Sequence, residues 1–359
     1  MPMRRHSVAV IPGDGIGKEV APAAMRVLQQ AARRYGFVLE ETTYMWNCDY
    51  YKEHGRMMPP DGLEQLRRHD AIFLGAIGNP AIVPDHISLR QSLLLWRQAF
   101  DLYINLRPVK VLPGIPSPLR ERPGLKVDMV FVRENSEGEY AGIGGRLRQG
   151  TPDEIAIQTT VFTRKGVERV MRYAFELARK RPAKRLACAT KSNAIQYTMV
   201  FWEEVCKELA KDYPDVQVNF YHIDALAARM VTHPETLDVV VTSNLFGDIL
   251  TDLGGALQGS LGLPASGNID PERRNPSLFE PVHGTAPDIA GKGIANPMAA
   301  VWAGVMMLEF LGEDEAAQGV MAALEAVARE GRVLTPDLGG TATTDEVAAA
   351  IAEKVAAGG

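Results

Sequence analysis

The pattern of hydrophobic and polar positions along the chain predicts short strands that alternate with longer helices. Short runs rich in apolar and β-branched residues are predicted as strands, at 8–11, 37–43, 71–75, 129–132, 186–190, 216–223 and 239–243. Segments of helical period flank most of them, the first at about 17–35. Such alternation is typical of βαβ units, which build a mostly parallel sheet. The predicted fold class is therefore α/β.

Two segments depart from this alternation. Residues 140–163 combine several glycines with an alternating run at 155–161, which favours a hairpin or projecting arm over a crossover unit. A projecting arm often pairs with another chain. The stretch 263–297 is predicted to be rich in loops. The segments after it are predicted as helices, at about 298–311, 315–330 and 344–355.

Length and composition limit the classes of protein that fit. With 359 residues the chain exceeds the usual length of one domain, so two domains with a ligand cleft between them are expected. A content of 46% hydrophobic and 23% charged residues is that of a well-packed globular protein. The net charge of −5 gives no global electrostatic reason to bind nucleic acid or an anionic membrane. Neither partner is therefore expected.

Location and redox state follow from local features of the sequence. It contains no apolar run of about 18 residues, the length that spans a bilayer. The basic N-terminal residues lead into a strand-like run without the apolar segment of a secretory signal, so the cytoplasm is the expected location. Cys48, Cys188 and Cys206 are widely spaced and odd in number, so they are expected to be packed, reduced thiols.

Candidate chemistry begins with Asp248 and Asp252, which follow the buried-strand candidate 237–242. A spacing of four places both carboxylates on one face of a helix. In apolar surroundings they repel each other, and a hard divalent cation such as Mg²⁺ or Mn²⁺ relieves that repulsion. The alternative is a helix start, whose dipole favours Asp. Asp224 follows the strand 216–223, either as a third ligand or as a helix N-cap.

Cationic side chains form the second candidate group. Arg97, Arg107 and Arg133 each follow an apolar residue instead of lying in a solvated run of charges. Planar guanidinium groups match carboxylates, so the three together indicate a small polyanionic ligand, whereas each alone would suit a structural ion pair. Lys191 ends an apolar strand, and Tyr140 lies at a glycine turn. Both are either proton-transfer groups or ordinary half-buried side chains.

Two glycine-containing segments are candidates for binding a cofactor. The segment 11–17 follows a strand and opens a helix, so a ligand can approach its backbone closely, but its spacing matches neither the Rossmann fingerprint nor a P-loop. The segment 280–291 is a better nucleotide candidate because its glycines also permit close approach. There Asp288 can accept hydrogen bonds from ribose hydroxyls and would repel a 2′-phosphate, which favours NAD over NADP.

Five motifs occur in a specific order: Ile-Pro-Gly-Asp-Gly-Ile-Gly at 11–17, Asn-Leu-Arg-Pro at 105–108, Glu-Gly-Glu-Tyr at 137–140, Asn-Leu-Phe-Gly-Asp at 244–248 and His-Gly-Thr-Ala-Pro-Asp at 283–288. In this order they resemble the isocitrate/3-isopropylmalate dehydrogenase family of β-decarboxylating enzymes, over nearly the whole chain. The resemblance implies a two-domain α/β fold with a mixed, largely parallel sheet and no Rossmann motif. Residues 1–106 and 259–359 would form a cofactor-side domain, and 107–258 a dimerisation and metal/substrate domain with an arm near 141–163.

The resemblance also implies roles for individual residues. Ligands of Mg²⁺ or Mn²⁺ would be Asp224, Asp248 and Asp252. Catalytic residues would be Tyr140, Lys191 and Asp224. Residues that bind substrate would be Ser92, Leu93, Arg97, Arg107 and Arg133. Residues that bind NAD would be Ile11, His283, Gly284, Thr285, Ala286, Asp288 and Asn296. A requirement for K⁺, which relatives often show, is left open.

The implied partner is a second copy of the chain, in a homodimer with shared active sites. In relatives the lysine and the first aspartate reach the site from the partner subunit, so Lys191 and Asp224 would complete the neighbour's pocket. The implied reaction is the oxidation of a small 2-hydroxy dicarboxylic acid, with β-decarboxylation where the keto acid allows. Segments 84–89, 189–193 and 268–273 are most similar to the branch of the family that acts on tartrate and D-malate.

Three alternatives remain. The loop 90–96 departs from the tartrate and D-malate branch, and Leu93 and Leu94 resemble the apolar pair that holds an isopropyl group, so 3-isopropylmalate dehydrogenase activity is the first. A non-catalytic regulatory subunit is more remote, because Tyr140, Lys191 and all three aspartates are retained. A phosphoryl-transfer enzyme is disfavoured because no phosphate loop accompanies the acidic pair.

Overall fold

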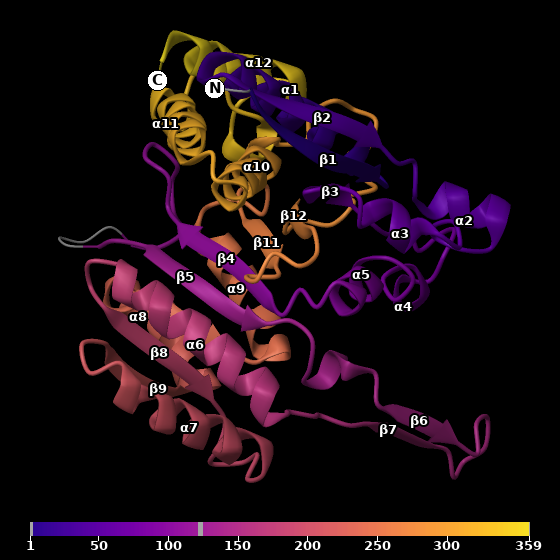
Figure 1. The fold of residues 1–359 in the computed structure, drawn as a ribbon, viewed down its shortest axis with the longest axis vertical. Coiled ribbons are helices and arrows are strands. Elements are labelled where there is room, and N and C mark those ends of the chain that lie inside the picture. The colour runs from indigo at the N-terminus through magenta and orange to yellow at the C-terminus, as the bar shows by residue number, and fades with distance from the viewer. Residues whose placement is uncertain (1–2, 121–124, 359) are drawn as a thin grey trace. The chain divides into compact units, whose positions relative to one another are not determined.

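The structure, a computed structural model, describes residues 3–120 and 125–358 (Figure 1). The chain divides into two compact units. Unit 1 contains residues 1–102, 111–118 and 255–359, and unit 2 contains residues 103–110 and 119–254. The assignment of a cofactor-side domain and a dimerisation domain stays a prediction.

Unit 1 is built on five strands in the order β2-β1-β3-β12-β11. Strands β2, β1, β3 and β12 run parallel, and β11 is antiparallel to β12. The strands are β1 (Arg4–Gly13), β2 (Phe37–Thr43), β3 (Ala71–Ala76), β11 (Ala265–Ile269) and β12 (Ser277–Pro281). The helices are α1 (Gly17–Tyr35), α2 (Cys48–His54), α3 (Gly62–Leu66), α4 (Asp85–Ser88), α5 (Leu93–Ala99), α10 (Met298–Leu311), α11 (Asp314–Glu330) and α12 (Thr344–Ala357), with a 3₁₀ turn η4 (Pro336–Leu338).

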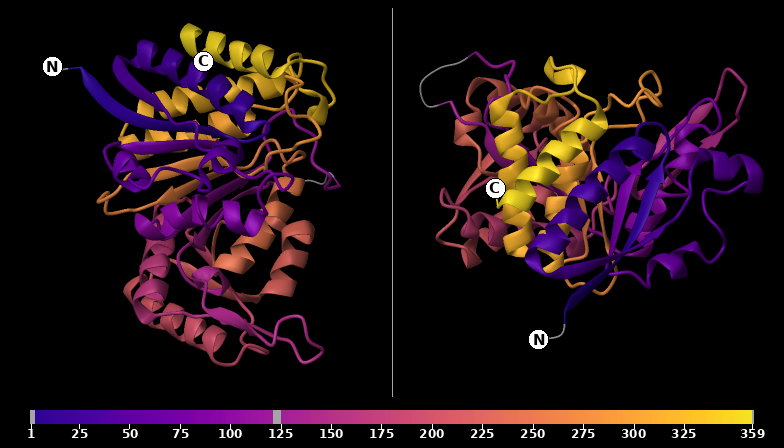
Figure 2. Two further views of the ribbon diagram at one scale, coloured as in Figure 1. Left: turned by 90° about the vertical axis from the view of Figure 1, so that its right-hand side faces the viewer. Right: turned by 90° about the horizontal axis from the view of Figure 1, so that it is seen from above.

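The long helices of unit 1 pack together as one group, in which α1 contacts α10, α11 and α12 (Figure 2). Helix α10 is buried from Met298 to Leu308, because its sequence is apolar on every face. Helix α12 begins at a capping box in which Thr343 and Glu346 each bond the other's backbone amide. Helix α1 of this group packs on β1, whose carboxyl end carries the glycine turn 13–17.

Unit 2 contains a second group of five strands, in the order β4-β5-β10-β8-β9. Strand β4 is antiparallel to β5, and the other neighbours are parallel. The strands are β4 (Ile104–Lys110), β5 (Asp128–Glu134), β8 (Arg185–Thr190), β9 (Gln217–His222) and β10 (Val239–Thr242). The helices are α6 (Arg164–Lys180), α7 (Thr198–Leu209), α8 (Ile223–Thr232) and α9 (Asn244–Leu257), with 3₁₀ turns η1 (Glu139–Ala141), η2 (Ala210–Asp212) and η3 (Pro234–Thr236).

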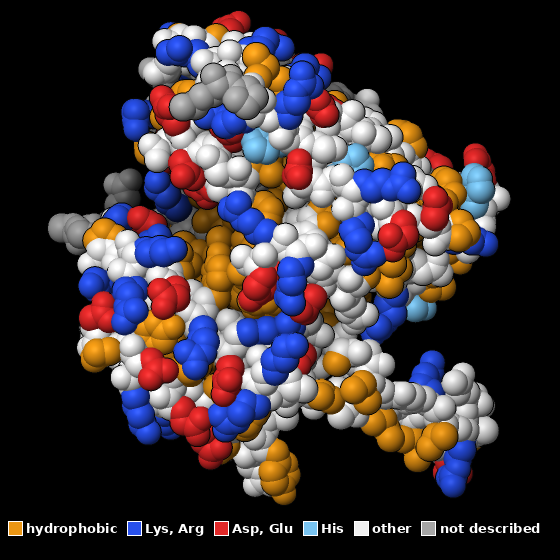
Figure 3. All heavy atoms as spheres, in the orientation of Figure 1, with side chains coloured by type: hydrophobic (Ala, Val, Ile, Leu, Met, Phe, Trp, Pro, Cys, Tyr) orange, Lys and Arg blue, Asp and Glu red, His pale blue; other side chains and the backbone are white. Residues whose placement is uncertain are grey.

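A two-stranded ribbon, β6 (Gly144–Leu147) and β7 (Ile155–Gln158), belongs to unit 2. Its strands pair antiparallel, so the predicted hairpin is confirmed. Every residue of both strands is exposed. Apolar side chains gather along it (Figure 3), among which Leu147 is 60% and Ile157 54% exposed.

The predicted α/β class with a mixed, largely parallel sheet is confirmed. The loop-rich interpretation of 263–297 is wrong in part, because β11 and β12 lie within it. These strands bury the polar residues Ser266, Asn268 and Glu280, which conceal the usual apolar pattern of a buried strand. Strand β4 was also not predicted, since Pro108 within it argues against a strand.

The cysteines and the hydrophobicity of the helices were also considered in the sequence. Cys48, Cys188 and Cys206 are buried and free of disulfides, as expected. Within residues 3–120 and 125–358, no helix combines the length and the apolar character needed to cross a membrane.

Candidate active site

The carboxylate pair lies on α9, directly after the fully buried strand β10. Asp248 and Asp252 are one helical turn apart, so both project from the same side of the helix. Gly247 allows α9 to pack closely on its neighbours. A Cβ atom there would lie 2.4 Å from Thr242 Oγ1 and 2.7 Å from Arg133 Cγ, which leaves no room for a side chain.

Asp248 contacts three other side chains of unit 2 that were predicted to belong to the active site. Arg133 Nη1 donates to its Oδ1 at 2.5 Å, and Arg107 Nη1 lies 3.6 Å from the same oxygen. Tyr140 Oη donates to Oδ2 at 2.6 Å. These groups come from β4, β5, η1 and α9, so the fold brings together side chains that are far apart in the sequence.

Two neutral side chains that were not singled out from the sequence orient the arginines. Asn244 Oδ1 accepts from Arg133 Nε at 3.0 Å and from Nη2 at 2.7 Å. Thr251 Oγ1 accepts from Arg107 Nη1 at 2.6 Å. Because these acceptors are uncharged, they fix the guanidinium groups without neutralising their charge. The only signal in the sequence for Asn244 and Thr251 is that each lies about one helical turn from Asp248.

The electrostatics of the carboxylate pair suit a cation. Burial raises the pKa of Asp252, and the charge of Asp248 adds to that effect, while Arg107 opposes it. Asp252 is nevertheless exposed, so its carboxyl group is accessible to a cation. Oxygen ligands of this kind are the ones that Mg²⁺ and Mn²⁺ prefer, and either ion would offset the repulsion.

Lys191 and Asp224 form a separate pair in unit 2. Lys191 Nζ lies 3.0 Å from Asp224 Oδ1, and this hydrogen bond lowers the pKa of the Asp224 carboxyl. The two residues follow β8 and β9, which are neighbouring parallel strands, so the carboxyl ends of the strands bring them together. The N-cap alternative for Asp224 is wrong, because His222 occupies that position of α8.

The three predicted metal ligands do not gather within one chain. Over residues 3–120 and 125–358, no group of three His, Cys, Asp or Glu side chains could hold a metal ion. A site made from Asp248, Asp252 and a partner's Asp224 stays a prediction.

The remaining predicted substrate residues lie in unit 1. Arg97 is buried and its Nη2 lies 3.3 Å from Glu280 Oε1, which also accepts from Asn268 Nδ2 at 2.8 Å. Ser92 is buried, with its hydroxyl donating to the Ser88 carbonyl at 2.6 Å. Leu93 packs partly buried against the core. A role of these three residues in binding substrate stays a prediction.

The two candidate cofactor segments meet within unit 1. Ile11 is fully buried at the end of β1, and the Ile16 amide, just beyond it, donates to the Thr285 carbonyl at 2.9 Å. A Cβ at Gly15 would lie only 2.1 Å from that carbonyl oxygen, so glycine permits the contact. His283 Nε2 is buried and has no hydrogen-bond partner among the residues that the structure describes, and burial lowers the pKa of this imidazole. A neutral imidazole with a free nitrogen suits the recognition of a nucleotide.

Other residues that are predicted to bind the cofactor have defined environments. Ala286 has φ of 40°, and Gly284 and Asp288 are exposed. Asn296 is held at both ends, since its Nδ2 donates to Asp337 Oδ2 at 3.0 Å and its Oδ1 accepts from the Met298 amide at 2.9 Å.

Glu19 was not singled out in the sequence, and it anchors the end of the candidate cofactor segment 280–291. Its two carboxylate oxygens accept from the amides of Gly291 and Gly293, at 2.6 and 2.9 Å. An acidic residue in the first turn of α1 was its only sequence signal.

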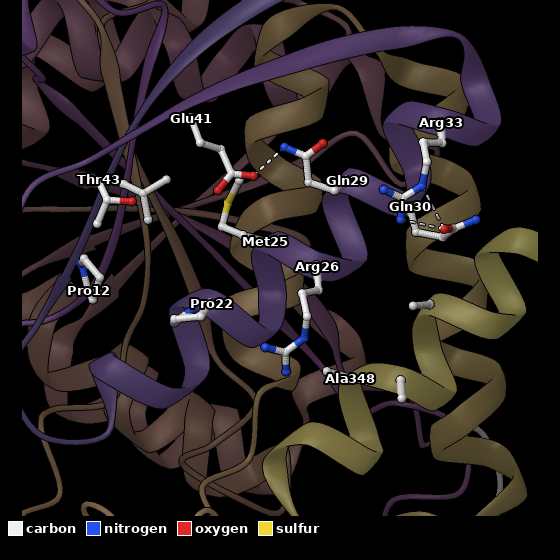
Figure 4. Close-up of a pocket in the computed structure, with 13 residues that line it drawn as sticks. Pro12, Pro22, Met25, Arg26, Gln29, Gln30, Arg33, Glu41, Thr43 and Ala348 are labelled. Carbon is white, nitrogen blue, oxygen red and sulfur yellow. Dashed lines mark hydrogen bonds between the residues drawn. The ribbon is translucent and has the colours of Figure 1, made fainter.

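A groove of about 580 Å³ lies on unit 1 between α1, β1, β2 and α12 (Figure 4). None of the predicted site residues lines it. Its polar side chains bond each other, Gln29 with Glu41 and Arg33 with Gln30. The candidate chemistry is therefore elsewhere, around Asp248.

Fold and site together define an α/β dehydrogenase. The chain matches the family described as isocitrate/isopropylmalate dehydrogenase over residues 7–351, and it belongs to that family. It is therefore an oxidoreductase acting on a CH–OH group.

Individual relatives match over almost their full lengths. The D-malate dehydrogenase [decarboxylating] of Escherichia coli (strain K12) is 54% identical over 355 residues, which cover 97% of this chain and 98% of the relative. The tartrate dehydrogenase/decarboxylase of Pseudomonas putida is 51% identical over 363 residues, covering 99% of each. The crystal structure of isocitrate dehydrogenase from Methylococcus capsulatus has a TM-score of 0.87 and 38% identity, covering 98% of this chain and 99% of that one.

Proposed function

We propose that this chain catalyses the NAD-dependent, divalent-metal-dependent oxidation of tartrate, D-malate or both, with β-decarboxylation where the keto acid allows. The observation that carries the proposal is the arrangement around Asp248, where two buried arginines and the Tyr140 phenol meet one member of the carboxylate pair of α9. The relatives named for D-malate and tartrate support this choice of acid.

Asp248 and Asp252, with the partner subunit's Asp224, would hold Mg²⁺ or Mn²⁺. The raised pKa of Asp252, caused first by burial and then by Asp248, supports a site that gains from a cation. A divalent cation held there would make the substrate's 2-hydroxyl more acidic and would stabilise the negative charge that develops as carbon dioxide leaves, and NAD⁺ would supply the acceptor for the hydride from C2.

The protein's own residues would bind the acid and move its protons. Arg107 and Arg133, with Arg97, would hold the two carboxylates as guanidinium forks do. The partner subunit's Lys191, paired with Asp224, would take the hydroxyl proton. The bond between C3 and the β-carboxylate then breaks, and Tyr140 would return a proton to C3. Its 2.6 Å contact with Asp248 keeps the phenol beside the carboxylate pair.

We also propose that the active unit is a homodimer whose subunits share sites. The exposed apolar ribbon β6-β7 supports a second chain as partner. The test mixes two inactive variants, Lys191→Ala and Asp248→Asn. Co-refolded in equal amounts, they should regain about one quarter of wild-type activity, because half of the dimers carry one intact site. No recovery would refute shared sites.

The substrate is tested with purified enzyme and a panel of D-malate, the tartrate isomers and 3-isopropylmalate, followed by NADH absorbance. Reactions run with Mg²⁺ or Mn²⁺, with a chelator, and with and without K⁺. We expect turnover of D-malate or tartrate that the chelator abolishes and fresh metal restores. The half-buried Leu93 and Leu94 favour 3-isopropylmalate as the second candidate, and a strong preference for that acid would overturn our choice.

A further inference from the structure

The turn that carries Tyr140 is fixed by a carboxylate three residues earlier, at Glu137. Glu137 Oε2 accepts from the Thr163 amide at 2.8 Å, and Oε1 accepts from Thr163 Oγ1 at 2.5 Å. Thr163 is the N-cap of α6, where its hydroxyl accepts from the Gly166 amide at 3.0 Å. The Glu137 side chain is thus bound to the start of a long, well-packed helix.

The first turn of α6 has space for this carboxylate. A Cβ atom at Gly166 would lie 2.3 Å from Glu137 Oε2 and 2.4 Å from its Cδ. Any side chain at residue 166 would therefore expel Glu137 from its place. A glycine here, at an ordinary helical position, is explained by the carboxylate that it accommodates.

The backbone of Glu137 is held from two other directions. Its amide donates to the carboxylate of Glu134, at 3.0 and 2.9 Å, and this carboxylate is fully buried at the end of β5. Its carbonyl accepts from Asn244 Nδ2 at 3.3 Å. Asn244 is the same residue that orients Arg133. Glu137 therefore joins the start of α6 to β5 and to the first residue of α9.

The phenol depends on this anchor through a short connection. Gly138 has φ of 72° and ψ of −143°, and its amide donates to the Val161 carbonyl at 2.9 Å. The 3₁₀ turn Glu139–Ala141 follows at once and places Tyr140 Oη 2.6 Å from Asp248 Oδ2. With only two residues between them, a shift of Glu137 must move the Tyr140 hydroxyl.

We propose that Glu137 is a positioning residue for Tyr140, which holds the turn between α6 and α9 so that the phenol stays on Asp248. The role of Tyr140 as proton donor rests on the proposed function, whereas the anchoring of its turn does not. Glu137 itself bonds Thr163 rather than Asp248, so it acts only through the turn.

The experiment compares Glu137→Ala with Glu137→Gln and with the control Glu208→Ala, which removes an exposed carboxylate of α7 that pairs with Arg164. Gln can still accept from the Thr163 amide, and its NH₂ can donate to the hydroxyl, so it is the conservative rescue. Thr163→Val removes the hydroxyl donor while keeping the side-chain shape. Each variant is measured for kcat, for KM with D-malate and NAD, and for thermal unfolding.

We expect Glu137→Ala to lower kcat about 10- to 100-fold, as misplacement of a reacting group by about 1 Å does, with both KM values within about threefold. Glu137→Gln and Glu208→Ala should keep kcat within about threefold. In a Tyr140→Phe background, Glu137→Ala should add little further loss, because the group on which it acts is already gone. Thr163→Val should give a smaller fall in kcat of the same kind, and it decides the question if Glu137→Ala does not fold.

A kcat of Glu137→Ala within twofold of wild type would overturn the proposal, as would losses that multiply in the double variant. Crystal structures of the wild type and the Glu137 variants distinguish failure of the positioning role from failure of the proposed function. If the wild type does not oxidise D-malate or tartrate, the positioning role is judged from the Tyr140 to Asp248 contact alone. That contact should be broken in Glu137→Ala and kept in Glu137→Gln, and its persistence in Glu137→Ala would refute the inference.

Discussion

A single methyl group at Gly247 should damage substrate binding more than it damages the fold. A Cβ there would lie 2.4 Å from Thr242 Oγ1 and 2.7 Å from Arg133 Cγ. Thr242 and Arg133 are at most 1% exposed, so neither has open space to enter. Overpacking of this kind costs about 1–3 kcal/mol, and Gly to Ala within a helix returns about 1 kcal/mol. The net loss in the free energy of unfolding is therefore at most about 2 kcal/mol.

The effect on the site is larger because Arg133 must give way. The distance from the new Cβ at residue 247 to Arg133 Cγ must increase from 2.7 Å to an ordinary contact of 3.4 Å, so Cγ retreats by about 0.7 Å. The guanidinium then loses its alignment with Asn244 and Asp248, and with it the orientation proposed for binding a carboxylate. One charge-assisted hydrogen bond contributes about 1.5–3 kcal/mol, so KM for D-malate in Gly247→Ala should rise about 10- to 100-fold.

The assay is steady-state NADH production at varied D-malate and at varied NAD, together with thermal unfolding. Ala256→Ser is the control, since it also adds one heavy atom to α9 but at an exposed position, and it should leave all values unchanged. KM for NAD should stay within about twofold in both variants. A Gly247→Ala enzyme with wild-type KM for D-malate would show that the close approach of α9 to Arg133 is unimportant.

Three further predictions concern other parts of the chain. Burial lowers the pKa of His69 below its ordinary 6.5, so the unfolded chain binds more protons than the folded chain near that pH. The free energy of unfolding should therefore fall as the pH drops through 6.5. Urea unfolding of His69→Gln should show a shallower fall with pH, and a slope equal to that of the wild type would contradict this prediction. Glu19→Ala should raise KM for NAD about tenfold, because the amides of Gly291 and Gly293 lose their acceptor, and it should leave KM for D-malate unaffected. A KM for NAD equal to that of the wild type would count against the anchoring role of Glu19. Ile157→Asp should yield monomers by light scattering and abolish activity, whereas an active dimer would exclude the ribbon from the interface.

The sequence was sufficient to predict features that depend on local spacing. Asp248 and Asp252 follow from a separation of four residues on a helix, and their place after a buried strand follows from its run of valines. The helix bounds of α1 and α10 were predicted because each has a long periodic or wholly apolar sequence. Such signals are contained in one segment, so they require no knowledge of the rest of the fold.

Contacts between distant segments could not be predicted in this way. Thr251 holds Arg107 although 144 positions separate them, and Glu137 holds Thr163 on the far side of the ribbon. Nothing in either segment specifies its partner, because the pairing depends on which strands become neighbours. The strand β4 shows the same limit, since Pro108 is disfavoured within a strand and only the pairing of β4 with β5 reveals that one forms there.

The ribbon β6-β7 has a consequence for newly made chains. An isolated two-stranded hairpin with all residues exposed is at best marginally stable in water, so it gains most of its stability when another surface covers it. In the homodimer that we propose, its unpaired edges and apolar side chains would remain open to wrong partners at low expression, until a second copy is met. The yield of correctly assembled protein should therefore rise with chain concentration at first and fall at high concentration, where encounters between incompletely folded chains outpace correct pairing.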